Sequence, residues 1–197
     1  HDVDQDGEID SGDAQLVAQR WVTGRDICSA SYPIATSAVR VRAPVSVAVG
    51  TVFTASVLID DPQDLGGFEF DLAFDPTVLQ VEDAALGDLL GSTGRTSAAL
   101  GSIIDNTAGT IAFGGYTRGE QVGVSSAGEL AQITLRATGP GSSTLDIQNP
   151  LLVSPSGDLT VAADQDASVV VPRGYEVYLP LALRNDTGAW SWTFGRR

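Results

Sequence analysis

The stretch GGFEFDLAFD, residues 66–75, alternates large apolar side chains with small or acidic ones. A period of two is typical of a β-strand that buries one face and leaves the other toward solvent. The buried face expected here carries four large side chains: Phe68, Phe70, Leu72 and Phe74. The opposite face then carries Gly67, Glu69, Asp71 and Ala73. This stretch therefore predicts a strand at the centre of a half-buried sheet.

The same period of two recurs along the chain from Val39 onward. Turn-forming segments such as DPQDLGG, NTAG and GPGS separate the alternating stretches. Many short strands at such spacing indicate a β-sandwich of jelly-roll type. We thus expect a mainly β fold, a nine-stranded jelly-roll sandwich, with strands near residues 39–43, 52–60, 66–75, 78–84, 101–105, 110–117, 128–138, 143–148 and 167–172.

Composition limits the functions that this chain can have. Its 197 residues suffice for one medium β-domain with small appendages. The net charge of −14 disfavours nucleic acid and anionic membranes and favours cations. No apolar run reaches the roughly 20 residues of a membrane span. We expect a secreted, extracellular or cell-surface protein that neither inserts into a membrane nor binds nucleic acid.

Few side chains are available for catalysis. The single His is at position 1, and Cys28 is the only cysteine, so no intramolecular disulfide can form. Carboxylate pairs such as Glu69 and Asp71 exist, but acid–base catalysis needs a cleft and two well-separated pKa values. The sequence specifies neither, and we expect no enzymatic activity.

The first residues, HDVDQDGEIDSGD, place acidic groups at alternate positions of a loop of about twelve residues. Gly7 is at the sixth position, where the chain must turn with a positive φ. Ca²⁺ prefers six to eight oxygen ligands at flexible distances, whereas a solvated acidic tail needs no such spacing. We expect bound Ca²⁺, with ligands Asp2, Asp4, Asp6, Glu8 through its carbonyl, Asp10 through water, and Asp13.

The segment after this loop, DAQLVAQRW, has helical spacing and ends near Gly24. A calcium loop closed by Asp and followed by one helix resembles a dockerin repeat, the module that binds cohesin domains. Dockerins normally carry two repeats, and one is present here. The resemblance implies partner contacts at Ser11, Gly12, Ala18 and Gln19.

Two longer stretches resemble a cohesin domain. They are VAVGTVFTASVLIDDPQDLGGFEFDLAFDPTVLQVEDAALGDLL and GELAQITLRATGPGSSTLDI, and the similarity covers about residues 38–172. In cohesins the partner docks on a sheet face that includes the third, fifth, sixth and eighth strands. Together with the alternation, the resemblance implies contacts at Glu69, Asp71, Gly114, Tyr116 and Thr117. The alternative is that the two acids are simply the solvent side of a sheet.

The ends of the chain flank this domain. Residues 1–24 form the dockerin-like segment, 25–37 a linker, 38–172 the cohesin-like sandwich and 173–197 an apolar strand-like tail. Trp190, Trp192 and Phe194 share one face of an extended strand in that tail. The tail either folds back on its own domain or docks on a neighbouring subunit by strand addition.

These features predict a non-catalytic assembly protein stabilised by Ca²⁺. A dockerin-like segment and a cohesin-like domain on the same chain favour head-to-tail self-association into an extracellular polymer or filament. The alternative is a cohesin-type scaffold module that binds a separate dockerin-bearing protein. A second alternative is a carbohydrate-binding sandwich that binds polysaccharide through the aromatic strip.

Overall fold

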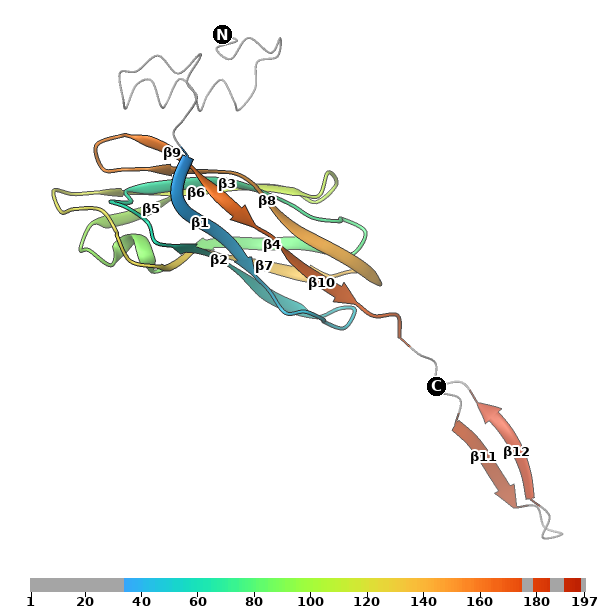
Figure 1. The fold of residues 1–197 in the computed structure, drawn as a ribbon. Helices are drawn as coiled ribbons and strands as arrows, with labels where there is room; N and C mark the ends of the chain where they lie inside the picture. Colours follow the sequence, from blue (N-terminus) through green and yellow to red (C-terminus); the bar gives the residue numbers. More distant parts are fainter. Residues whose placement is uncertain (1–33, 175–178, 185–189, 196–197) are drawn as a thin grey trace, which may run out of the picture.

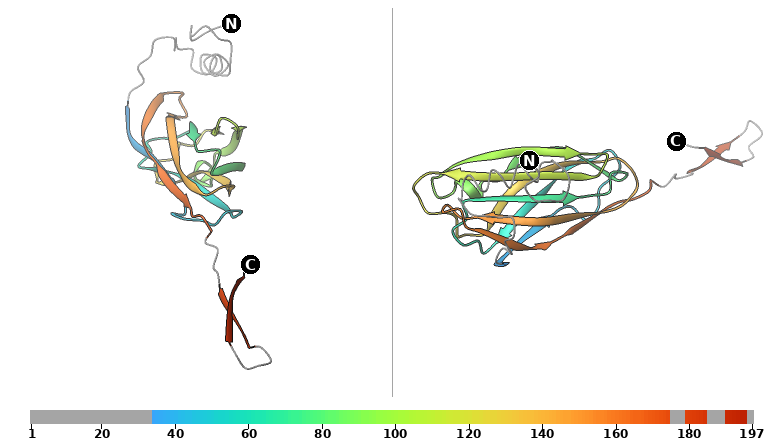
Figure 2. Two further views of the ribbon diagram at one scale, coloured as in Figure 1. Left: turned by 90° about the vertical axis from the view of Figure 1, so that its right-hand side faces the viewer. Right: turned by 90° about the horizontal axis from the view of Figure 1, so that it is seen from above.

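A computed structural model of the chain describes residues 34–174, 179–184 and 190–195, with side chains described from Ser37 to Gly174. Ten strands form one hydrogen-bonded sheet that curves over on itself into two packed layers (Figure 1, Figure 2). Two further strands pair with each other as a separate sheet. The predicted mainly β sandwich is confirmed.

The strand order is β4-β7-β2-β1-β9-β8-β3-β6-β5, with β10 paired to β8. The pairs are antiparallel except β1–β9, which is parallel. The strand bounds are β1 Ile34–Arg42, β2 Val52–Asp60, β3 Gly67–Ala73, β4 Leu79–Leu86, β5 Thr96–Asp105, β6 Thr110–Arg118, β7 Gly128–Ala137, β8 Gly141–Val153, β9 Leu159–Gln165, β10 Ala167–Val171, β11 Leu179–Arg184 and β12 Trp190–Gly195.

All nine predicted strands are present, and the structure adds β9. It also extends β5 and β8, and it begins β1 at Ile34, inside the predicted linker 25–37. Strand β9 lacks the alternation of a half-buried strand, since in it only Leu159 and Ala162 are buried. It is held by parallel pairing with β1, which is far away in sequence. Strand β5 begins at Thr96 rather than at the predicted residue 101, and most of its residues are exposed. Neither feature has a local hydrophobic signal.

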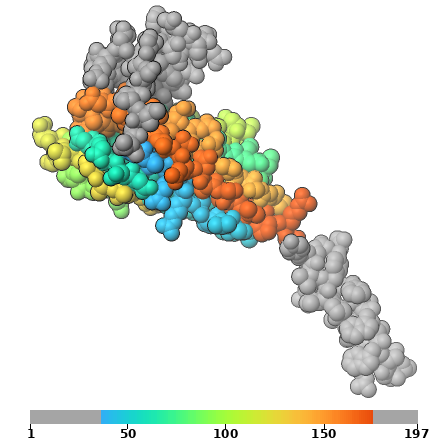
Figure 3. All heavy atoms as spheres, in the orientation of Figure 1, coloured from blue at the N-terminus to red at the C-terminus, as the bar shows by residue number. Residues whose placement is uncertain are grey.

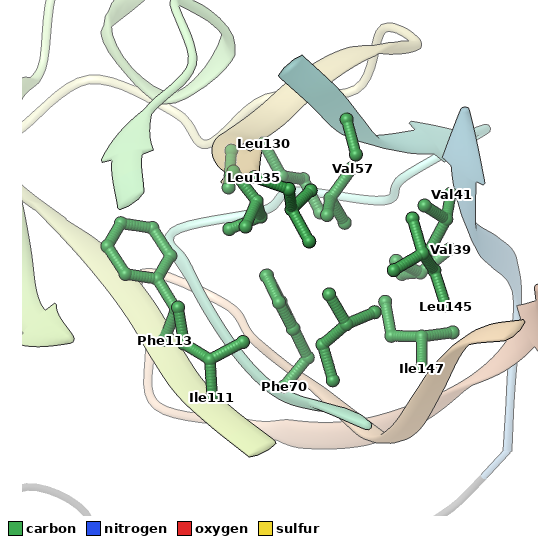
Figure 4. Close-up of a cluster of buried hydrophobic side chains, with 14 of the residues drawn as sticks. Val39, Val41, Val57, Phe70, Ile111, Phe113, Leu130, Leu135, Leu145 and Ile147 are labelled. Atoms are coloured by element: carbon green, nitrogen blue, oxygen red, sulfur yellow. The ribbon is translucent and has the colours of Figure 1, made fainter. Parts of the chain in front are cut away.

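The core fills the space between the two layers. Phe70 is 1% exposed, and its ring centroid lies 6.0 Å from that of Phe68 and 6.2 Å from that of Phe113. Leu135 and Ile147 approach this cluster from β7 and β8 (Figure 4). Burying an aromatic or aliphatic side chain of this size stabilises a fold by about 1.5–3 kcal/mol. The predicted inward face of β3 is therefore confirmed.

One side chain joins the edge of one layer to a turn of the other. Asn106, in the β5–β6 turn, accepts a hydrogen bond from the Val81 N–H at 2.8 Å and donates one to the Val81 carbonyl at 2.9 Å. Val81 lies on the edge strand β4, beside a register shift. The Asn106 carboxamide thus takes the place of a neighbouring strand at that point.

Strands from both ends of the domain meet on one surface of the sandwich. Atoms of the β1–β2 region, in blue and cyan, adjoin those of β9 and β10, in orange (Figure 3). Over the described ranges, no helix has the length and apolar character to cross a membrane.

Candidate docking face

The outer face of β5, β6, β3 and β8 carries four of the five residues that the sequence singles out in the sandwich: Glu69, Asp71, Gly114 and Tyr116. The strand register places Asp71 between Ala112 of β6 and Gln148 of β8, and Ala112 in turn lies opposite Ile103 of β5. Directly paired residues point to the same side of a sheet. One row of side chains therefore crosses four strands on the solvent side.

Glu69 and Asp71 are two residues apart on this face. Glu69 is partly buried and lies between Gly114 and Leu151, whereas Asp71 is exposed. Burial raises the pKa of both carboxyl groups above their ordinary values, and the charge of Asp71 raises the pKa of Glu69 further. Because the two negative charges repel and are partly desolvated, this pair favours a partner that donates hydrogen bonds or brings a positive charge.

Beside the acids lies an apolar area on β5. Leu100 and Ile103 are each 63% exposed. Leu100 is the extra residue of a register shift between Ala99 and Gly101, and the φ of Gly101 is +101°. Large apolar side chains that remain exposed together on a folded domain are typical of an interaction surface.

Gly114 has no side chain, and its role on this face is to leave room for a neighbouring side chain. A Cβ at this position would lie 3.2 Å from Leu100 Cδ1 and 2.8 Å from the Phe68 carbonyl oxygen. The absence of a side chain therefore lets Leu100 lie over β6. This explains why a glycine occupies one of the predicted contact positions.

Tyr116 bounds the face at one end together with Arg118, a residue that the sequence analysis did not single out. Arg118 donates a hydrogen bond from its guanidinium to the Tyr116 hydroxyl at 2.8 Å, and its Cζ lies 5.1 Å from the ring centroid. The two residues are two apart on β6, so the spacing alone could have placed Arg118 beside Tyr116. The pair adds one positive charge to an otherwise acidic surface.

Thr117 does not lie on the exposed face. Its side chain is 9% exposed, and its hydroxyl donates to the Gly66 carbonyl at 2.8 Å while accepting from Arg95 Nε at 2.7 Å. Arg95, itself 8% exposed, also donates to the carbonyl of Gly119 at 2.6 Å and to that of Gln121. The prediction of a partner contact at Thr117 conflicts with this burial: with Tyr116 outward, the next residue on the strand points inward.

The other predicted site residues lie outside the described part of the chain. This applies to the expected calcium ligands Asp2, Asp4, Asp6, Glu8, Asp10 and Asp13, and to Ser11, Gly12, Ala18 and Gln19. Trp190, Trp192 and Phe194 belong to β12, whose backbone pairs with β11, but their side chains are outside the described set. Within the ranges that the structure covers, no group of three or more His, Cys, Asp or Glu residues could hold a metal ion.

Comparison with known proteins identifies a family. The family model for the cohesin domain matches residues 38–171. No curated protein sequence matches the chain.

Three solved structures illustrate the structural similarity. The first is a non-cellulosomal cohesin from the archaeon Archaeoglobus fulgidus, with a TM-score of 0.55 and 18% identity, covering 71% of this chain and 93% of that one. The second is a type I cohesin–dockerin complex from Clostridium thermocellum, with a TM-score of 0.56 and 14% identity, covering 73% and 96%. The third is the sixth cohesin of scaffoldin B from Acetivibrio cellulolyticus in complex with a Cel5 dockerin, with a TM-score of 0.55 and 12% identity, covering 70% and 99%. At these identities the similarity is one of fold.

Proposed function

The chain belongs to the cohesin domain family, and we propose that its sandwich is the receptor half of a protein–protein interaction. The docking surface is the outer face of β5, β6, β3 and β8. The observation that carries this proposal is the exposed pair Leu100 and Ile103 beside the carboxylates of Glu69 and Asp71. Covering the apolar side chains releases water and stabilises a complex, while the acids set its orientation.

The partner proposed for this face is a dockerin-type calcium segment. The sequence of residues 1–24 resembles such a segment, and a second copy of the chain would present it to the face. Contact between residues 1–24 of one copy and the docking face of the next is heterologous, so repeated contacts close into rings or continue into filaments. Ca²⁺ would hold the acidic loop in shape, with its ligands between Asp2 and Asp13. The proposed setting is extracellular, and the role is assembly rather than catalysis.

A dockerin on a separate protein is the alternative occupant. Two of the similar solved structures are complexes of a cohesin with a dockerin. That arrangement would make the chain a scaffold module, and residues 1–24 would then bind a different partner.

Sedimentation velocity of the full chain tests the proposal. We expect concentration-dependent oligomers with Ca²⁺ and smaller species with EDTA, because chelation should release the calcium-dependent contact. The double variant Leu100→Asp/Ile103→Asp should form smaller species than the wild type in Ca²⁺, because two charges on the apolar area oppose its burial. The control is Val122→Asp, since Val122 is 75% exposed and lies outside the four strands of the face.

The outcomes separate the two partners. A wild-type chain that sediments identically with Ca²⁺ and with EDTA refutes calcium-dependent self-association. A purified dockerin protein that binds the wild type and Val122→Asp, but not the double variant, would then support the scaffold role. Equal oligomerisation of the double variant and the wild type would refute the assignment of the face.

A further inference from the structure

The ten-stranded sheet has three strands with an outer edge, and two of these edges are occupied. On β4, the Asn106 carboxamide binds the N–H and the carbonyl of Val81, and the strand carries the charges of Glu82 and Asp83. On β10, Val170 donates to the carbonyl of Val45 at 2.9 Å and accepts from the Val47 N–H at 3.1 Å. Side-chain bonds, charges and covering loops are ways in which proteins protect sheet edges.

The third edge, that of β5, has little protection. Among the described residues this strand pairs only with β6. Residues 96–104 form a run of nine without a charge or a proline. The register shift at Leu100 is the one protective feature, and most side chains of the strand are exposed. Such an edge is a template for an added strand.

In the part of the chain that the structure describes, a two-stranded sheet stands apart from the ten-stranded one. Strands β11 and β12 pair in antiparallel fashion from Leu179 opposite Gly195 to Arg184 opposite Trp190. An isolated two-stranded sheet is marginally stable in water and gains stability from a third strand. Pro180 removes a backbone donor from β11, whereas β12 contains no proline. The edge of β12 is therefore the better one for further pairing.

Charge also favours contact between the hairpin and the sandwich. Residues 34–171 carry sixteen carboxylates against five arginines. Residues 179–197 carry three arginines, Arg184, Arg196 and Arg197, against one aspartate. Opposite net charges speed association and orient the two surfaces.

We propose that β12 of one copy adds as a strand to the free edge of β5 in a second copy. The added strand supplies backbone hydrogen bonds to β5 and extends the four-stranded layer. The hairpin of the same copy is a poorer candidate. With β12 beside β5, β11 would lie six strand spacings, or about 28 Å, from β10. The seven-residue connection between β10 and β11 spans at most about 25 Å when fully extended.

Cross-linking between two single-cysteine variants tests the proposal. In a Cys28→Ser background, Ser102→Cys marks β5 in one chain and Ser191→Cys marks β12 in another. After mixing and treatment with a short bismaleimide, a covalent dimer is expected. Gln132→Cys replaces Ser102→Cys in the matched control, because Gln132 is exposed on β7 in the other layer. This control should lose the dimer band.

Every other outcome overturns the proposal. Equal bands for Ser102→Cys and Gln132→Cys show a contact without preference for β5. A dimer from Ser102→Cys alone shows that β5 pairs with β5. The double variant Ser102→Cys/Ser191→Cys could instead form a cross-link within one chain while the mixed single-cysteine variants give no dimer. That result would show that β5 pairs with the hairpin of its own chain. EDTA separates this contact from the calcium-dependent docking proposed above, because strand addition should persist after chelation.

Discussion

Replacing Asn106 by alanine removes the side chain that bridges the β4 edge. Two hydrogen bonds are lost, of 2.8 Å and 2.9 Å, and both involve the backbone of Val81. Each intramolecular hydrogen bond contributes about 1 kcal/mol net, so the free energy of unfolding should fall by about 2 kcal/mol. With an m-value of roughly 2 kcal/mol/M in urea, the midpoint should fall by about 1 M.

Far-UV circular dichroism is the suitable signal for this titration. The ten strands of the sandwich span residues 34–171, which contain no tryptophan, whereas far-UV circular dichroism follows these strands directly. Thr107→Ala is the matched control, because the Thr107 side chain is exposed and only its backbone N–H bonds to Asp105. The m-value should stay unchanged, which shows that the same surface is exposed on unfolding.

The variant Asn106→Asp separates the two hydrogen bonds. A carboxylate still accepts from the Val81 N–H but repels the Val81 carbonyl, so at neutral pH this variant should be at least as unstable as Asn106→Ala. Acidification should restore stability, because the protonated group can donate to that carbonyl. If Asn106→Ala and Thr107→Ala unfold at the same urea concentration, the bridge contributes nothing and the reasoning is refuted.

Three further predictions concern stability. Gly109→Ala (φ +76°) should destabilise the fold more than Gly94→Ala (φ +83°). At Gly94 the new methyl group meets open space and costs about 1–2 kcal/mol of backbone strain, whereas at Gly109 it also collides with a backbone carbonyl. Equal urea midpoints for the two variants would contradict this. Burial raises the pKa of Glu69 above its ordinary 4.5, so the folded state loses stability as the pH rises from about the unfolded-state pKa to the folded-state pKa. Glu69→Gln should therefore raise the urea midpoint at neutral pH but not near pH 4.5. Hydrogen bonds lower the carboxyl pKa of Asp75, so Asp75→Asn should lower the urea midpoint at neutral pH. Arg95→Lys should lower the free energy of unfolding by about 2 kcal/mol, because an ammonium cannot replace the planar guanidinium that donates to three acceptors. It should also speed amide hydrogen exchange in residues 119–124, and unchanged exchange would count against this role of Arg95.

Alternation along β3 and β6 allowed the sequence to predict which side of each strand faces the core. Phe70 and Phe113 are buried as expected, and Asp71 lies on the opposite face. This succeeded because the period of two is a local property of an extended chain with one buried face. Thr117 is buried although it was grouped with the outward residues, because strict alternation after Tyr116 turns the next side chain inward.

The free edge of β5 could not be predicted in this way. Its N-terminal half has no alternation, and only the pairing with β6 shows that it is a strand. The bridge from Asn106 to Val81 spans 25 positions in sequence, and nothing in either local segment indicates it. Buried Arg95 likewise depends on three acceptors that the fold brings together.

By itself, the sequence determined the β-class, the inward face of each alternating strand and the resemblance to cohesins, because side-chain periodicity and turn residues act within a few positions. Only the tertiary structure decided which strands are neighbours, and thereby joined Ile103, Ala112, Asp71 and Gln148 into one row. The physical reason is that strand pairing is a long-range choice. Each pairing depends on backbone hydrogen bonds that any residue except proline can donate, so the identity of the partner strand leaves no local trace in the sequence.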